Sequence, residues 1–225
     1  MISSNRSHTV RALSVPGRGF VGSFAAVSAA AKSVEMLLNA CFNDPDPSLR
    51  PIPGATTKAI LVRTEELVKS DTGQLSFSRP ALTLYTYRID FNKTMRAAWA
   101  GAGTNDGKAH LPLDIHFLIT PWGDDAEAEH RILGKAMECL ELNPVLSGPM
   151  LYPDNVSNWL PADAVHVVQE DVSTEAMMRT FDTLPTKYKL SVPYIARVVR
   201  VDSRRAYPTP QTNDVETRLR PGGRE

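Results

Sequence analysis

Hydrophobic and polar residues alternate along residues 110–120. The residues of one parity are all apolar, namely Leu111, Leu113, Ile115, Phe117 and Ile119. Asp114, His116 and Thr120 fall on the other parity. Because successive side chains of a strand point to opposite faces, this alternation predicts a strand with one buried and one wetter face.

The period changes to that of a helix after Trp122. Apolar residues then recur three and four positions apart, at Ile132, Leu133, Ala136, Met137 and Leu140. This spacing predicts one buried helix face. Asp124 and Glu127 are placed to form a capping box at the start of the helix, and Pro144 ends it because the proline ring restricts the residue before it.

The rest of the pattern predicts four further strands and two further helices. The strands are expected at 59–64, 81–91, 165–169 and 192–202, and the helices at 23–42 and 174–184. Residues 143–164 contain four prolines and predict an irregular connection. In the strand at 81–91, alternation puts one set of side chains on each face: Tyr85, Tyr87, Ile89 and Phe91 on the first, Leu82, Leu84, Arg88 and Asp90 on the second. These elements predict a compact α/β body.

Three segments lack apolar periodicity. Residues 1–22 are rich in Ser, Arg and Gly and predict a flexible basic N-terminal arm, and residues 204–225 predict a flexible C-terminal tail. Residues 100–108 are small and Gly-rich, which predicts a mobile hairpin connection. We therefore expect one folded domain at 23–203 between two arms.

The charge balance and the cysteines limit which partners and which cellular compartment we expect. The 225-residue chain has 25 basic and 25 acidic residues, so its overall charge does not favour a nucleic acid or an acidic membrane as a partner. The Ala-rich run before Lys32 and Glu35 is too short to cross a bilayer, which needs about 20 apolar residues. Cys41 and Cys139 fall on apolar helix faces far apart in the chain, a placement that predicts buried, reduced thiols in a reducing cytosol.

No pattern of catalytic or metal-binding residues stands out. His110 and His116 share a strand face, but six residues separate them by roughly 20 Å at about 3.3 Å per residue, too far to share a metal ion. His130 with Glu127 or Asp125 could form an acid/base pair only in a cleft that the sequence does not indicate. Nucleophile-elbow, zinc-protease, paired-cysteine and phosphate-loop motifs do not occur. The sequence thus predicts a protein that is not an enzyme and that holds no cofactor or metal.

Three segments resemble the Pvc16-like N-terminal domain family. They are YRIDFNKTMR at 87–96, LPLDIHFLITPWGDDAEAEHRILGKAMECLELNPVL at 111–146 and YKLSVPYIARVVRVDS at 188–203. This family is associated with phage-tail-like extracellular contractile injection systems. The resemblance implies a single α/β (α+β) domain with a mainly antiparallel sheet packed by amphipathic helices, like that of a tail terminator.

The resemblance also implies a structural role. A tail terminator, or cap, is a hexameric ring of identical copies that ends the inner tube and the contractile sheath and fixes their length. The implied partners are further copies of the chain, the inner tube protein and the sheath protein, with no nucleic acid and no direct insertion into a membrane. Assembly is expected in the cytoplasm of a bacterium, as part of a particle that can be released. The residues we expect at partner interfaces are Arg88, Asp90, Arg96, Trp99, Asp114, His116, Trp122, Arg204 and Arg205.

A second hypothesis stays open at this point. Arg88, Asp114 and His116 lie on neighbouring predicted strands and could line a pocket. The chain would then be a small-molecule enzyme or a cargo-handling adaptor that works beside such a particle.

Overall fold

The computed structural model contains one six-stranded sheet with strand order β1-β2-β3-β6-β5-β4. It describes residues 24–67, 75–99, 110–153, 159–161, 163–184 and 186–202, without the side chains of residues 97–99 and 198. The strands are β1 (Lys58–Val62), β2 (Ala81–Phe91), β3 (His110–Trp122), β4 (Val145–Ser147), β5 (Ala164–Gln169) and β6 (Val192–Asp202). β1 pairs with β2 in parallel, and all other pairings are antiparallel. The predicted α/β class with a mainly antiparallel sheet is confirmed.

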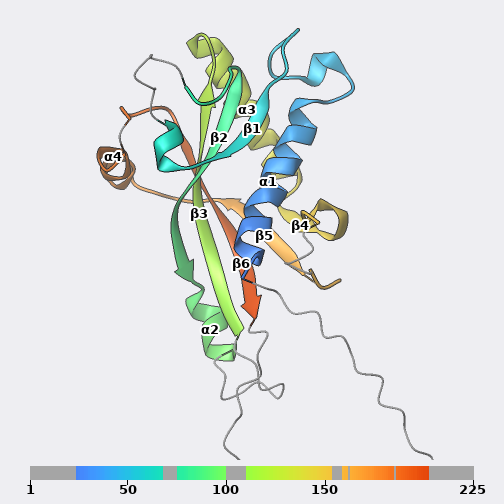
Figure 1. Cartoon of the computed structure of the whole chain (residues 1–225), viewed down its shortest axis with the longest axis vertical. Coiled ribbons are helices and arrows are strands. Elements are labelled where there is room, and N and C mark those ends of the chain that lie inside the picture. Colours follow the sequence, from blue (N-terminus) through green and yellow to red (C-terminus); the bar gives the residue numbers. More distant parts are fainter. Residues whose placement is uncertain are drawn as a thin grey trace, which may run out of the picture.

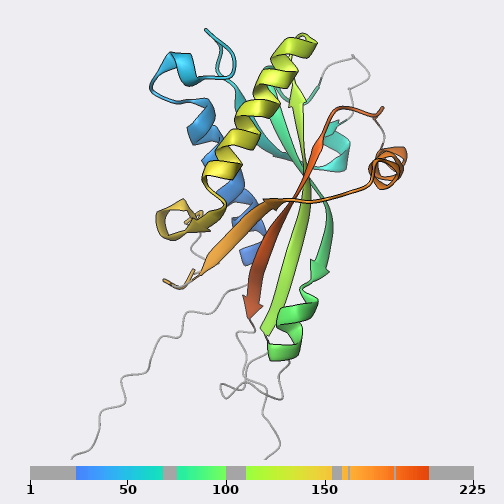
Figure 2. The same ribbon diagram turned by 180° about the vertical axis from the view of Figure 1, so that it is seen from behind.

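The helices cover the two sides of the sheet unequally. Helices α1 (Ala26–Phe42) and α3 (Ala126–Leu142) lie side by side on one side, and the shorter α4 (Thr174–Asp182) lies on the other (Figures 1 and 2). Helix α2 (Lys93–Trp99) lies at the end of the sheet where β2 ends and β3 begins. Within the described residues, no helix is long and apolar enough to cross a membrane.

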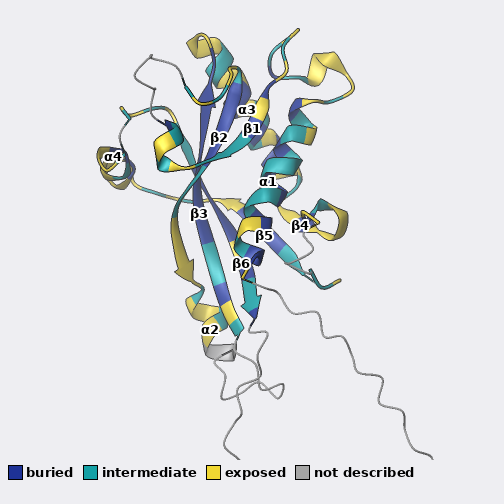
Figure 3. Cartoon of the chain, in the orientation of Figure 1, coloured by how far each residue is buried: buried dark blue, intermediate teal, exposed yellow. Residues whose placement is uncertain are grey.

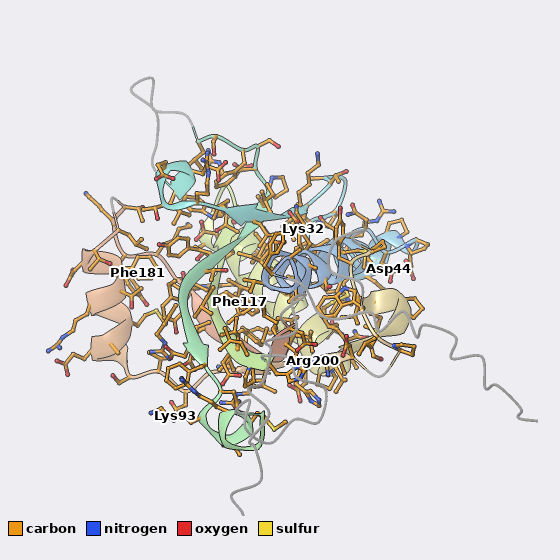
Figure 4. All side chains as sticks on the ribbon, turned by 60° about the horizontal axis from the view of Figure 1, so that its bottom comes forward. Lys32, Asp44, Lys93, Phe117, Phe181 and Arg200 are labelled. Atoms are coloured by element: carbon orange, nitrogen blue, oxygen red, sulfur yellow. A yellow bond between two sulfur atoms is a disulfide. The ribbon has the colours of Figure 1, made fainter. Side chains whose placement is uncertain are left out.

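The main core lies between the sheet and the α1/α3 pair. Small residues on α1, including Ala26 and Ala30, are fully buried and let the helix approach the strands closely. Phe117 of β3 stacks on Tyr194 of β6 with ring centroids 6.1 Å apart. Figure 4 shows Phe117 in the middle of the sheet and Phe181 of α4 on the opposite side. The apolar face predicted for residues 132–140 is thus buried as expected.

A disulfide joins α1 to α3. The sulfur atoms of Cys41 and Cys139 are bonded, and the Cα atoms of the two residues are 6.3 Å apart. The prediction of two reduced thiols is therefore wrong. Periodicity placed each cysteine on an apolar helix face correctly, but it could not show that these two faces pack against each other.

The second face of β3 is also buried along most of its length, contrary to the wetter face predicted from alternation. His116 and Thr120 are 4% and 5% exposed. Leu118, on the same parity, packs against Met177 and Phe181 of α4. Burial extends over both faces of the upper half of the sheet and gives way to exposed residues at the lower end of β2 (Figure 3). Alternation failed here because α4 covers Leu118, while Tyr87 and Glu170 contact His116.

A β-bulge in β2 reverses which side chains share a face. Thr86 pairs with Phe117 and Arg88 with His116, so Tyr87 is an extra residue in β2. Tyr87 packs with the α4 cluster, whereas Ile89, paired with Ile115, lies on the α1/α3 face. The prediction that Tyr85, Tyr87, Ile89 and Phe91 share one face is wrong for this reason.

Most predicted elements are present, with two additions. β2 and β6 have the predicted bounds, and α1, β1, α3, β5 and α4 differ from the predicted bounds at their ends. Helix α2 and the short strand β4 were not predicted. The cap of α3 is Asp125, whose side chain accepts a hydrogen bond from Ala128 N at 2.7 Å, and not Asp124. The arms predicted at 1–22 and 204–225 and the connection at 100–108 lie outside the described residues.

Candidate functional site

A polar cleft opens on the α4 side of the sheet, at the end that α4 does not cover. Its volume is about 550 Å³, within the range of ligand and side-chain docking sites. Strands β2, β3 and β6 supply its floor, and the first residues of α2 supply one wall. The lining side chains that carry charge or a hydrogen-bonding ring or amide are Arg88, Asp90, Asn92, Lys93, Asp114, His116, Glu170 and Arg197.

Glu170 is the centre of the hydrogen-bond network in this cleft. Its Oε2 atom lies 2.8 Å from His116 Nδ1 and accepts a hydrogen bond from the Tyr87 hydroxyl at 2.8 Å. Arg88 Nη2 donates to Glu170 Oε1 at 3.1 Å. Glu170 follows β5, and its own backbone N–H donates to Pro193 O of β6, which fixes its position beside the sheet. Strands β2 and β3 and the connection after β5 therefore contribute side chains to one network.

Two aspartates complete the polar surface. Asp90 Oδ2 lies 2.9 Å from Arg88 Nε and 3.5 Å from His116 Nε2. Asp114 accepts two hydrogen bonds from Asn92 Nδ2, at 3.1 and 3.2 Å, and Asn92 Oδ1 in turn accepts from Met95 N in the first turn of α2. Asp114 thus fixes the side chain of Asn92, the residue that precedes α2.

The network shifts the pKa of two of its members. Burial alone would raise the pKa of Glu170, but hydrogen bonds from His116 and Tyr87 and the nearby charges of His116 and Arg88 lower that pKa below its ordinary value of 4.5. Burial raises the pKa of the Tyr87 phenol, and the bond to the Glu170 carboxylate raises it further. The favoured state is therefore an ionised carboxylate held by a neutral phenol and a guanidinium.

The charged groups of the cleft are arranged around one another. Among the described residues, the cleft lining contains one hydroxyl side chain, Thr94, and no serine or cysteine. His116, Glu170 and Arg88 bond to one another instead of pointing into free space. No group of three or more potential metal ligands occurs among the described residues.

The outer edge of β1 is occupied by side chains of α1. The amide of Asn39 bonds the backbone of Ala59 twice, donating to its carbonyl at 2.9 Å and accepting from its N–H at 3.0 Å. Glu35 Oε1 accepts from Leu61 N at 3.1 Å. These bonds replace those of a further strand, so this edge is closed to strand addition.

Unlike the edge of β1, the outer edge of the lower half of β2 is open within the described residues. β1 pairs with β2 only as far as Tyr85, and no described strand pairs with the outer side of β2 from there to Phe91. Ile89 and Phe91 are each 45% exposed on this segment. An extended segment with exposed apolar side chains and an unoccupied edge is able to pair with another chain.

The structure brings together four of the nine residues predicted at interfaces. Arg88, Asp90, Asp114 and His116 share the cleft. Arg96 lies on α2, outside the cleft lining, with its guanidinium 4.3 Å from the centre of the Phe91 ring.

The other predicted interface residues lie elsewhere. Trp122 is 9% exposed at the opposite end of β3, where its Nε1 donates to Thr83 Oγ1 at 2.9 Å. Trp99 lies in α2, and its side chain is outside the described residues, as are Arg204 and Arg205.

Sequence reasoning missed Glu170, Tyr87 and the α1 side chains that close the β1 edge. Glu170 follows a short strand in a polar stretch, and nothing in its neighbours distinguishes it from a surface glutamate. Tyr87 was placed on the opposite face from Arg88, whereas the bulge, which is not visible in the sequence, brings both side chains to Glu170. The polar residues Glu35 and Asn39, which are four apart and lie within a largely apolar helix, were a signal that could have been used.

A comparison with known protein families identifies one family. The family described as Pvc16 N-terminal domain matches residues 38–213. No curated protein matches the chain.

Two solved structures of cap proteins have similar folds. One is a sheath/tube terminator of an extracellular contractile injection system in its extended state, with 15% identity and a TM-score of 0.49, covering 88% of this chain and 65% of its own. The other is the tube terminating cap of the anti-feeding prophage, with 14% identity and a TM-score of 0.47, covering 77% of this chain and 54% of its own. The chain thus spans less than two thirds of either. On the match over residues 38–213, the chain belongs to the Pvc16 N-terminal domain family.

Proposed function

We propose that this chain is a structural cap of a contractile injection system. In this role, copies of the chain form a hexameric ring that ends the inner tube and the sheath and so sets their length. The observation that carries the proposal is membership of the Pvc16 N-terminal domain family over most of the chain. The partners are other copies of the chain, the inner tube protein and the sheath protein.

The two edges described above support a role in termination. A growing polymer continues as long as each new layer offers the surface that the next layer needs. A cap must bind the last layer on one side and offer no equivalent surface beyond it. The β1 edge, closed by Asn39 and Glu35, cannot be extended, whereas the free edge of β2 and its exposed apolar residues can receive a partner segment.

Particles assembled without this chain test the proposal. We expect tubes and sheaths of variable length, or sheaths that detach at one end, in electron micrographs. Supplying the chain from a plasmid should restore uniform lengths. Particles that keep normal tips and a uniform length in its absence would exclude a cap function.

A further inference from the structure

The open edge of β2 lies along residues 86–91. β1 leaves β2 after Tyr85, and no strand among the described residues pairs with the outer side beyond that point. Figures 1 and 3 show this part of β2 at the margin of the sheet, coloured as exposed. Unpaired backbone N–H and C=O groups beside exposed apolar side chains form a template for a further strand. The partner that this edge fits is therefore another extended segment.

The backbone groups of Ile89 and Phe91 point to the open side. Asn92 N donates to Pro112 O of β3 at 2.9 Å, so the backbone groups of Asn92 face β3. In an antiparallel ladder the direction of these groups alternates from one residue to the next. The groups of Asp90 therefore also face β3, whereas those of Ile89 and Phe91 face outward. A strand added at this edge can bond to Ile89 and Phe91 without disturbing the β2–β3 ladder.

The side chains on either side of Ile89 are complementary to a second copy of the same segment. Arg88 and Asp90 both line the cleft and flank Ile89 in the strand. When two copies pair antiparallel with Ile89 opposite Ile89, Arg88 of each copy lies opposite Asp90 of the other. A register centred on Arg88 or on Asp90 would place like charges opposite each other, which is unfavourable. The segment thus selects one register for pairing with itself.

The ion pair already present within the chain is compatible with this register. Arg88 Nε lies 2.9 Å from Asp90 Oδ2, and the two side chains are 49% and 54% exposed. In the paired register each Arg88–Asp90 pair keeps its bond and lies beside the same pair of the other copy, with opposite charges adjacent. The charges therefore choose the register. The attraction comes from the backbone bonds of Ile89 and from burial of its exposed side chain.

We infer that two free copies of the chain pair along the lower half of β2, with Ile89 at the two-fold axis. A contact that uses the same patch on both copies closes at two and does not extend into a polymer. Its short ladder makes the dimer weak and reversible. The inference goes beyond the proposed cap, and one part of it rests on that proposal: the dimer covers the edge that a tube or sheath segment would occupy, so a polymer end must displace the second copy.

The variant Ile89→Pro tests the backbone bonds of the dimer. Proline is tolerated at edge positions whose N–H faces outward, so the sheet should keep its fold. We expect sedimentation velocity to show a concentration-dependent dimer of the wild-type chain. Ile89→Pro should raise its dissociation constant at least about tenfold, because hydrogen bonds across the axis are lost. The control Phe24→Ser removes an apolar side chain that is 75% exposed just before α1 and should leave the dimer unchanged.

Two cysteine variants of the full chain test the register. In the inferred dimer the two Ile89 residues form a hydrogen-bonded pair with Cα atoms about 5.5 Å apart, which suits a disulfide. The two Phe91 residues are separated by the rise of four residues, about 14 Å, which is too far. Oxidised glutathione, which takes up the two electrons and two protons of the thiols, should therefore join Ile89→Cys chains and not Phe91→Cys chains on non-reducing gels.

The cross-linked Ile89→Cys dimer tests whether the dimer covers the edge used for capping. Its two edges are locked together, so we expect it to label the ends of particles that lack this chain only after reduction. Wild-type chain given the same oxidant and reductant is the control, because reduction also opens the Cys41–Cys139 disulfide. Equal end labelling by the oxidised and the reduced dimer would overturn the covering of that edge.

The outcomes keep the dimer and the cap apart. Wild-type chain that ends tubes but stays monomeric at every soluble concentration overturns the dimer and leaves the cap. Cross-linking of Phe91→Cys as readily as Ile89→Cys also overturns the inferred dimer, and this comparison decides the matter if Ile89→Pro fails to fold. A dimer that Ile89→Pro weakens and Ile89→Cys locks, together with normal particle ends in the absence of the chain, excludes the cap and leaves the dimer.

Discussion

Glu170 is the single residue on which the cleft network depends. It bonds three side chains, Tyr87, Arg88 and His116, from strands β2 and β3. Replacing it by glutamine leaves the size unchanged but removes the charge that Arg88 faces. We expect Glu170→Gln to cost about 2–3 kcal/mol of unfolding free energy, measured by urea titration, because hydrogen bonds to buried charged groups are worth more than neutral ones.

The same residue predicts a pH dependence. The folded pKa of Glu170 is below its ordinary value of 4.5, so the unfolded chain binds a proton more readily. The stabilisation is therefore complete above that ordinary value and is lost as the pH falls through the lower, folded pKa. Stability curves between pH 7 and pH 3 should fall less steeply for Glu170→Gln than for wild type. Glu65→Gln, at an exposed position, should follow the wild-type curve, and parallel curves for all three proteins would contradict the network.

Asn39 makes a second residue-scale prediction. Its amide satisfies both backbone groups of Ala59 on the outer edge of β1. Asn39→Ala should cost about 1–3 kcal/mol, because it leaves a backbone donor and acceptor without partners. It should also increase aggregation at high protein concentration, measured by light scattering, since an open edge can pair with another chain. Asn43→Ala, which removes an exposed amide bond to Asn39 O at the helix end, is the matched control and should not aggregate.

At the scale of elements, the disulfide fixes α1 against α3. It closes a loop with a sequence separation of 98 residues, and cross-links of that length commonly contribute about 2–4 kcal/mol by restricting the unfolded chain. We expect reduction, or the double variant Cys41→Ala/Cys139→Ala, to lower the melting temperature by several degrees in calorimetry. Equal melting temperatures with and without reductant would show that the two thiols are not joined in solution.

Sequence patterns predicted where helices and strands lie better than they predicted which side chains share a face of the sheet. The alternation at 110–120 located β3, and the 3.6-residue period located α3, because both signals are local. The bulge at Tyr87, the contact of Glu170 with His116 and the contact between Cys41 and Cys139 all depend on residues distant in the chain. For the cleft, Arg88, Asp114 and His116 could be expected together, since neighbouring strands carry them. Glu170 could not, because a connection beyond β5 places it there.

At the scale of the whole molecule, capping should depend on the lower half of β2. Ile89 and Phe91 are exposed on the segment that β1 does not cover, so their replacement by serine should change unfolding free energy by less than about 1 kcal/mol. If a tube or sheath segment pairs there, Ile89→Ser/Phe91→Ser should leave the fold intact and lower the fraction of particle ends that carry the chain. Immunogold labelling of particle ends measures that fraction.

Substitution of a distant apolar residue distinguishes this contact from non-specific hydrophobic association. Leu142 is 73% exposed at the end of α3, so Leu142→Ser removes a comparable apolar area from another surface. Normal end labelling for Leu142→Ser and reduced labelling for the β2 variant would locate the partner at the open edge. Equal labelling for both would mean that the last layer of the polymer is held elsewhere on the molecule. The closed edge of β1 would then limit strand addition at that edge without accounting for binding to the tube.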